Sequence, residues 1–416
     1  MADQRPSALA GLQADGPSLG EEVLGSLITV ARSLHPDELP QAVLDHARRL
    51  GATDAVVYLV DLEQRVLVPM GLDGTLAEAG PVDIDATLAG RAFRSQDVVE
   101  GEAEGGERRL WIPLLDGSER LGVLAVAVPS VDPLTERRLR WLASLTADLL
   151  VSKGAYGDVV ALTRRRRAMK LASELRWAML PPLSFTSPFV EIAGVVEPAY
   201  DVAGDSFDYA VNGSVVHLAI FDAMGHGLEA SRMANLAVGG HRHGRRHGLG
   251  LVETFMAIDE AVTRSFGHEH FVTGQLAALD LATGRLAVAS GGHPRPLLLR
   301  GNAVVGELAG DVCTPMGLGR PPVVTETQLE PGDRVVFYTD GVVEARSPAG
   351  EEFGLDRLGD LLGRAAAAQE VPAETMRRLT HSVLAHEAGQ LRDDATLLLV
   401  GWRGAMSDRA AARPVA

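Results

Sequence analysis

Cysteine and long apolar runs are the first things that this chain of 416 residues lacks. Cys313 is its single cysteine, which excludes an internal disulfide and any cysteine-based zinc site and fits a reducing compartment. No apolar run approaches the roughly 18 residues that a membrane-spanning helix needs. The N-terminus has no basic flank followed by an apolar core, so it is not expected to be a signal peptide. These absences predict a cytoplasmic protein that is not bound to a membrane.

Positive charge is also scarce. The chain has 39 lysines and arginines against 55 aspartates and glutamates, a net charge of −16, and Lys153 and Lys170 are its only lysines. This balance argues against a nucleic-acid partner and against an anionic membrane surface. The basic run Arg164–Arg167 is therefore expected to be the solvated face of a linker rather than a nucleic-acid patch.

The length allows two or three domains, each with its own core. Residues 1–20 are expected to be a flexible leader, and residues 404–416, which are small, charged and end near a proline, a disordered tail. Between them we expect a first domain at residues 21–150, a helical linker at 151–182 and a second domain at 183–403. Both domains mix helices and strands, so the predicted fold class is α+β, with an α/β first domain.

The first domain shows helix periodicity over residues 21–50, followed by strand pairs around turns at residues 61–64 and 116–118. This order resembles a GAF sensory domain. The resemblance implies either a small ligand, held between the sheet and residues 83–102, or a purely structural role in dimerisation. The sequence does not identify such a ligand. It also leaves open whether the chain forms a homodimer through this domain and the linker.

The stretch from residue 201 to 227 predicts two strands joined at an Asn-Gly turn, residues 212–213. With that pair at the centre of the loop, Asp205 faces Ile220. Asp222 is then a diagonal neighbour of Asp205 on the same face, roughly 7–8 Å away. Adjacent carboxylates repel each other unless a cation lies between them, and an all-oxygen site suits Mg²⁺ or Mn²⁺. On this stretch alone, solvated turn residues are an equally good interpretation.

Four aspartates stand at the ends of apolar strands: Asp205, Asp222, Asp340 and Asp393. If these strand ends meet, their charge requires at least one divalent cation and more naturally two. Two such ions about 3.5–4 Å apart activate a water and clamp a phosphoryl group. The chain has no G-x-S-x-G motif, reactive cysteine or P-loop. The pattern therefore favours hydrolysis of phosphate esters without a protein nucleophile.

Seven ordered motifs carry a closer resemblance. They are DVAGDSFD, FDAMGHG, FVT, SGGHPRPLLL, PMGLG, LEPGDRVVFYTDGVVEAR and DDATLLL, spread from about Leu175 to Trp402. Their order and spacing are similar to those of SpoIIE-type phosphatases, the bacterial branch of the metal-dependent type 2C serine/threonine phosphatases. The resemblance implies an αββα sandwich with a binuclear Mn²⁺/Mg²⁺ centre at one end.

The resemblance also implies a role for each matching residue. Asp222 would bridge both metals, the backbone carbonyl of Ala223 and the carboxylate of Asp205 would bind one of them, and Asp340 and Asp393 the other. One departure stands beside Asp205, where Ala203-Gly204 replaces the usual pair of glycines. No arginine matches the one that clamps phosphate in the eukaryotic relatives.

The sequence does not decide the roles of several polar residues near these motifs. His226 either assists proton transfer or makes a structural hydrogen bond, and the role of His293 is undecided. Asp208 and Asp394 rank below the four aspartates, because they lie on the other strand face or one residue away. The histidines of the HRHGRRHG segment, residues 241–248, are expected to lie in a polar loop between two helices rather than to bind a transition metal.

The predicted function is a metal-dependent phosphatase that hydrolyses phosphoserine or phosphothreonine on a partner protein and is regulated by the N-terminal sensor. The resemblance implies that the partner is a phosphorylated anti-anti-sigma (STAS) protein in a partner-switching pathway. The alternatives are a catalytically decayed signalling scaffold and a two-metal phosphodiesterase or nuclease. The net charge disfavours the polyanionic substrates of the last class.

Overall fold

The computed structural model describes residues 18–72, 80–201, 204–310, 313–389 and 391–405. Most of the expected leader, the tail beyond residue 405 and Ala203 lie outside the described residues. The described residues divide into two compact units: residues 18–61, 65–72, 80–116 and 120–164 form the first, and the other described residues form the second. None of the helices in the described ranges has the length and apolarity that crossing a bilayer requires.

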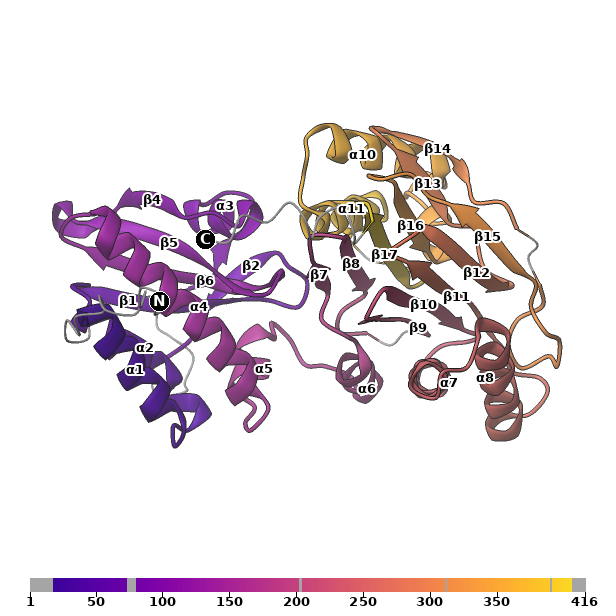
Figure 1. The fold of residues 1–416 in the computed structure, drawn as a ribbon, viewed down its shortest axis with the longest axis horizontal. Coiled ribbons are helices and arrows are strands. Elements are labelled where there is room, and N and C mark those ends of the chain that lie inside the picture. Colours follow the sequence, from indigo (N-terminus) through magenta and orange to yellow (C-terminus); the bar gives the residue numbers. More distant parts are fainter. Residues whose placement is uncertain (1–17, 73–79, 202–203, 311–312, 390, 406–416) are drawn as a thin grey trace, which may run out of the picture. The chain divides into compact units, whose positions relative to one another are not determined.

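The first unit is a six-stranded sheet with helices on both faces (Figure 1). Its strand order is β3-β2-β1-β6-β5-β4. The strands are β1 (Asp54–Val60), β2 (Val66–Pro69), β3 (Val82–Asp83), β4 (Val99–Glu102), β5 (Arg108–Asp116) and β6 (Glu119–Val128). The helices are α1 (Leu19–Ala31), α2 (Leu39–Arg49), α3 (Leu88–Ser95), α4 (Pro133–Gly154) and α5 (Val159–Arg164), with short 3₁₀ turns at Pro36–Glu38 and Glu104–Gly106.

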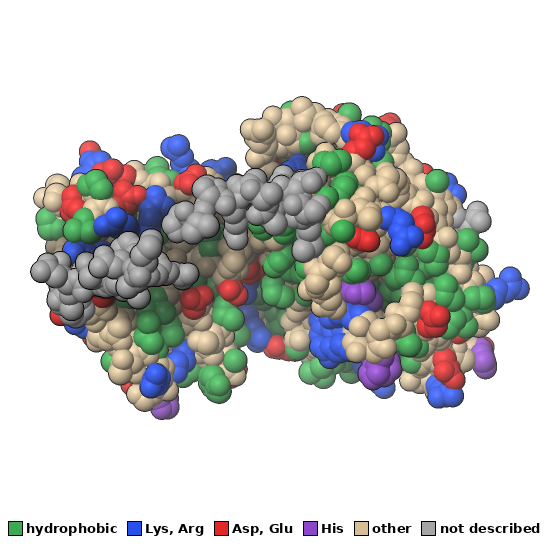
Figure 2. All heavy atoms as spheres, in the orientation of Figure 1, with side chains coloured by type: hydrophobic (Ala, Val, Ile, Leu, Met, Phe, Trp, Pro, Cys, Tyr) green, Lys and Arg blue, Asp and Glu red, His purple; other side chains and the backbone are tan. Residues whose placement is uncertain are grey.

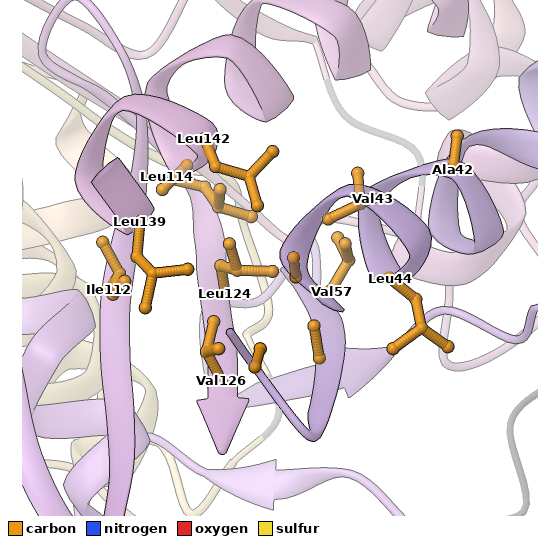
Figure 3. Close-up of a cluster of buried hydrophobic side chains, with 14 of the residues drawn as sticks. Ala42, Val43, Leu44, Val57, Ile112, Leu114, Leu124, Val126, Leu139 and Leu142 are labelled. Atoms are coloured by element: carbon orange, nitrogen blue, oxygen red, sulfur yellow. The ribbon is translucent and has the colours of Figure 1, made fainter. Parts of the chain in front are cut away.

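The core of this unit lies between the sheet and helices α1, α2 and α4. Leu139 and Leu142, one helical turn apart on α4, point at the sheet beside Leu114 of β5 and Leu124 of β6 (Figure 3). The opposite face of the sheet packs on α3 through a second cluster that includes Phe93. Both faces of β6 are therefore buried, which explains its almost uninterrupted apolar sequence.

The second unit contains two sheets in the orders β15-β12-β11-β10-β9 and β14-β13-β16-β17-β8-β7. The strands are β7 (Ser184–Thr186), β8 (Val190–Glu197), β9 (Asp205–Asn212), β10 (Val215–Ala223), β11 (Val272–Asp280), β12 (Arg285–Gly291), β13 (Leu297–Arg300), β14 (Ala303–Glu307), β15 (Val324–Gln328), β16 (Arg334–Tyr338) and β17 (Ala395–Trp402). The helices are α6 (Leu171–Met179), α7 (Leu228–Arg246), α8 (Leu251–Phe266), α9 (Asp340–Val343), α10 (Gly354–Ala367) and α11 (Pro372–His386).

Strand alternation builds four layers from these elements. On β10, Leu218 and Ile220 face the other sheet, whereas Ala219 and Phe221 pack under α7 and α8. On the second sheet the residues of β16 and β17 divide in the same way between the inter-sheet core and a cluster with α10 and α11. The predicted αββα sandwich is confirmed, and Figure 1 shows the paired sheets with helices outside them.

Two helical predictions were wrong in detail. The helical linker expected over residues 151–182 is broken between α5 and α6. At the break the backbone N–H of Arg166 donates to the Tyr200 hydroxyl at 2.7 Å, so a tertiary contact takes the place of a helical one. The HRHGRRHG segment is not an interhelical loop, because α7 continues to Arg246.

Candidate metal centre

The hairpin β9–β10 brings two of the four aspartates face to face. Asp205 pairs directly with Asp222, whereas Ile220 lies opposite Phe207. The predicted register, with Asp205 opposite Ile220, was therefore wrong by two residues. The two-residue loop begins one residue later than expected, at Gly213, whose φ of 60° suits the first central position of a type II′ turn. Direct partners lie about 4.5–5.5 Å apart at Cβ, closer than the predicted diagonal.

Both carboxylates point into the space between the sheets. Asp205 lies on the same face of β9 as Phe207, and Asp222 lies on the same face of β10 as Ile220. Both of these apolar residues belong to the core between the two sheets. Asp208 lies on the opposite face of β9 and faces α7. Asp205 is 1% exposed and Asp222 is partly buried, so the pair closes one end of the sandwich rather than lying in solvent.

Two glycines allow the other strand ends to approach closely. A Cβ at Gly341 would lie 1.8 Å from the carbonyl oxygen of Asp394. Asp340 at the start of α9 and the residues before β17 are therefore held against each other. In the first sheet, a Cβ at Gly204 would lie 2.3 Å from the carbonyl oxygen of Ala223. Any other residue at either position would force these segments apart.

Hydrogen bonds join the two sheets at this end. The Thr339 hydroxyl donates to Asp205 Oδ2 at 2.7 Å and accepts from the backbone N–H of Thr396 at 3.0 Å. The backbone N–H of Asp205 donates to Asp394 Oδ2 at 3.3 Å. Asp394, which the sequence analysis ranked below the four aspartates, is thus in direct contact with one of them. Asp393 is exposed beside it.

The carboxylates raise each other's pKa values. Burial, together with repulsion by Asp340, Asp393 and Asp394, raises the pKa of Asp222 to about 7. Burial and the charges of Asp394 and Asp222 raise the pKa of Asp205 well above its ordinary value. Burial raises the pKa of Asp394 to about 6, and burial with the nearby Asp393 raises that of Asp340. All five aspartates therefore belong to one electrostatic cluster, which a cation would relieve.

The donor atoms of this cluster fit a hard divalent cation, because all of them are carboxylate or carbonyl oxygens. Within the ranges that the structure describes, no three His, Cys, Asp or Glu side chains already stand in a metal-binding arrangement. The fit therefore rests on the type of donor and on the repulsion between the buried carboxylates. The carbonyl oxygen of Ala223, the one backbone donor that the sequence analysis named, lies against Gly204.

Thr273 supports Asp222 in the same way that Thr339 supports Asp205. Its hydroxyl donates to Asp222 Oδ2 at 3.3 Å and lies 3.1 Å from Nδ1 of His293. Burial lowers the pKa of His293 to about 3, so its imidazole is neutral. His226 is exposed in the turn before α7. The FVT and YTDG motifs contained both threonines, but the sequence carried no sign that their hydroxyls would reach the aspartates.

Asp208 belongs to a separate buried network. Its carboxylate accepts from Nδ1 of His241 at 2.9 Å, from Arg242 at 2.8 Å and from Arg245, all three on α7. Burial lowers the pKa of His241, although its hydrogen bond to Asp208 opposes the shift. These contacts fasten α7 to the outer face of β9, so His241 is a structural residue.

Two regions of the chain match the models of known protein families. Residues 212–403 match the family model of stage II sporulation protein E (SpoIIE), and residues 33–151 match that of a GAF domain. Over 135 residues the chain is 29% identical to Protein IcfG of Synechocystis sp., a span of 31% of this chain and 20% of that protein.

Two solved structures are also similar. The RsbU and RsbW domains of Rv1364c from Mycobacterium tuberculosis share 26% identity at a TM-score of 0.47, over 53% of this chain and 63% of that chain. The SiaA-PP2C domain of Pseudomonas aeruginosa shares 21% identity at a TM-score of 0.47, over 56% of this chain and 94% of that chain. The chain thus spans only part of IcfG and of the Rv1364c structure. The chain therefore combines a C-terminal region that matches the SpoIIE family with an N-terminal region that matches a GAF domain.

Proposed function

We propose that this protein is a metal-dependent phosphoprotein phosphatase that hydrolyses phosphoserine and phosphothreonine esters. The observation that carries the proposal is the convergence of five aspartates from both sheets at one end of the sandwich. Two of them, Asp205 and Asp222, are direct cross-strand partners. The pKa of Asp222 is raised to about 7 and that of Asp394 to about 6, as expected of carboxylates that share a site made for cations.

In this proposal two divalent cations, Mn²⁺ or Mg²⁺, would be held by these residues. Asp222 would contact both, Asp205 and the carbonyl of Ala223 would hold one, and Asp340 and Asp393 would hold the other. When bound, such a pair activates a water and stabilises the charge that develops on the phosphoryl group. This chemistry needs no protein nucleophile.

The chain's own residues keep the ligands in place. The hydrogen bond from Thr339 fixes the orientation of the Asp205 carboxylate. The hydrogen bond from Thr273 does the same for Asp222, and His293 in turn lies against the threonine hydroxyl. Because burial keeps His293 neutral, it adds no positive charge that would compete with the cations.

The substrate in this proposal is a small phosphorylated STAS-type protein, and the GAF domain regulates its dephosphorylation. Support comes from the seven ordered motifs, from the SpoIIE and GAF matches and from the acidic chain, which disfavours a polyanionic substrate. Acidic and basic side chains are interspersed on the face drawn in Figure 2. We place the protein in the cytoplasm, where such partners occur. A ligand of the GAF domain and a homodimer through that domain and the helices after it belong to the same proposal.

The decisive experiment measures Mn²⁺-dependent phosphate release from a generic phosphomonoester and from a phosphorylated STAS protein. Wild type should be active, and Asp222→Asn and Asp340→Asn should lose activity by roughly 10³-fold or more, because each removes a charged ligand of the cations that stabilise the transition state. Asp356→Asn, at an exposed position on α10, is the matched control and should behave as wild type. Wild type without metal-dependent activity on either substrate would instead favour a signalling scaffold. Faster cleavage of a phosphodiester than of the monoester would favour the phosphodiesterase.

Regulation is tested by comparing the full chain with a fragment of residues 165–416, the main part of the second unit. A change of at least severalfold in kcat/KM on the phosphorylated STAS protein would assign the regulatory role to the first unit. Equal kcat/KM values for the two proteins would contradict a regulatory role of the first unit.

A further inference from the structure

A fully buried arginine lies beside the metal centre and has no role in the function proposed above. Arg176, on α6, is 2% exposed. Its Nη2 donates to the carbonyl oxygen of Pro198, but Nε and Nη1 have no hydrogen-bond partner among the residues that the structure describes. Arginine is rarely buried so completely without being paired, because removing the guanidinium charge from water is costly. Such a residue requires compensation by nearby negative charge.

Helix α6 is fastened where it holds this arginine. The Ser173 hydroxyl donates to the carbonyl of Asp201 at 2.7 Å, and the Trp177 indole N–H donates to the carbonyl of Ala199 at 2.9 Å. Both acceptors lie in the segment that leads from β8 to Asp205. On the other side, the Ser231 hydroxyl of α7 donates to the carbonyl of Ala172 at 3.0 Å. The guanidinium is thus held in position and is not a mobile surface group.

The compensating charges are those at this end of the sandwich. Arg176 donates to the carbonyl of Pro198, and the preceding residue, Glu197, pairs with Ala395 across β8 and β17, one residue from Asp394. Asp394, Glu197 and Asp205 all act on Arg176 and oppose the lowering of its pKa by burial. The effect is mutual, because Arg176 opposes the rise in the pKa of Asp394. Asp394 in turn accepts the backbone N–H of Asp205. The guanidinium is therefore buried at the end of the sheet where Asp394 contacts Asp205.

We propose that Arg176 is the internal counter-cation of the metal centre: it shares Asp394 and Asp205 with the divalent ions and so limits how tightly the centre binds them. This inference rests on the proposed metal-dependent function. The physical reason is that a fixed positive charge repels an incoming cation, and does so most strongly where water is excluded. Arg176 also lowers the cost of keeping the carboxylates ionised before cations bind. Its burial excludes the alternative that it touches a substrate phosphate, so it is a positioning residue and not a catalytic one.

The test is a calorimetric titration of the metal-free full-length protein with Mn²⁺, without substrate. Arg176→Gln removes the charge and should tighten Mn²⁺ binding by roughly tenfold or more. Arg176→Lys keeps the charge and should stay within about twofold of wild type, since the Coulomb repulsion remains. Unchanged or weaker binding by Arg176→Gln, or an equal tightening by both variants, overturns the inference.

A second variant should change the Mn²⁺ affinity in the opposite direction. It tests the inference even if Arg176→Gln does not fold. Glu197 is a negative charge that also acts on Arg176. Glu197→Gln should therefore weaken Mn²⁺ binding, because less of the arginine's positive charge is offset. Unchanged or tighter binding by this variant counts against the inference. Wild-type protein that binds no Mn²⁺ overturns the proposed metal centre and this inference together, whereas wild-type binding with an unaffected Arg176→Gln overturns this inference alone.

Discussion

Asp205 and Asp222 stand directly opposite each other across the β9–β10 pair, both turned into the space between the two sheets. Like charges in this position destabilise a hairpin, so the pair works against the fold. The hydrogen bonds from Thr339 and Thr273 offset part of that cost. Metal-binding clusters generally oppose folding when they are empty and stabilise the fold once cations bind.

The first prediction concerns pH. The pKa of Asp222 is raised from 3.8 to about 7 in the folded chain. Its stabilising contribution is therefore complete below about pH 4 and is lost as the pH rises through 7. In EDTA, the free energy of unfolding should fall by on the order of 2 kcal/mol more between pH 5 and pH 7.5 for wild type than for Asp222→Asn. Urea titrations of both proteins at the two pH values measure this difference. Parallel pH profiles would contradict the raised pKa.

The second prediction concerns the close approach at Gly204. In Gly204→Ala, the new Cβ would meet the carbonyl oxygen of Ala223 at 2.3 Å and push β9 away from β10. We expect a loss of roughly 1–3 kcal/mol in the free energy of unfolding, measured by urea denaturation. Gly239→Ala on α7 is the matched control, because its Cβ would meet nothing within 4 Å. The control should be neutral or stabilising by up to about 1 kcal/mol, since alanine favours a helix. Equal effects at both sites would disprove the steric argument.

The third prediction concerns the Thr339 hydroxyl, which donates to Asp205 and accepts from Thr396. Thr339→Val leaves both partners unsatisfied, which should cost about 1–3 kcal/mol of stability. It should also raise the Mn²⁺ concentration needed for half-maximal activity, because Asp205 loses a hydrogen bond that favours its charged form.

Thr380→Val on α11 is the control for this substitution. Thr380 is equally buried, and its hydroxyl makes no hydrogen bond in the part of the chain that the structure describes. Replacing that hydroxyl by a methyl group should leave stability unchanged or slightly increased, and the metal requirement unchanged. Denaturant unfolding and Mn²⁺ activation curves of the two variants settle the comparison.

The fourth prediction concerns the buried network around Asp208. Asp208→Asn removes the negative charge that His241, Arg242 and Arg245 share. Leaving buried cations uncompensated should cost about 3–5 kcal/mol. Glu326→Gln breaks the exposed pair with Arg285 and should cost less than about 1 kcal/mol. Thermal unfolding of both variants gives the ranking, and a cost at Asp208 no larger than at the exposed pair would show that α7 is held by apolar packing alone.

Much of the fold followed from local patterns in the sequence. Alternation and apolar runs predicted β1, β2, β5 and β6 at nearly their observed positions, because one or both faces of these strands are buried. The motif order predicted the αββα sandwich and the four strand-end aspartates. The hairpin register failed because an Asn-Gly pair allows two neighbouring positions for a two-residue loop. Local sequence does not distinguish them, whereas pairing along the whole strand does.

By itself the sequence determined the composition of the site: which aspartates end apolar strands, which glycines stand beside them and how little positive charge the chain carries. Only the tertiary structure decided which groups meet. It placed Asp394 against Asp205, set Thr273 and Thr339 as donors and buried Arg176 against Pro198. The physical reason is that these contacts join residues from separate sheets and helices. Their distances depend on how the layers pack, which no local periodicity encodes.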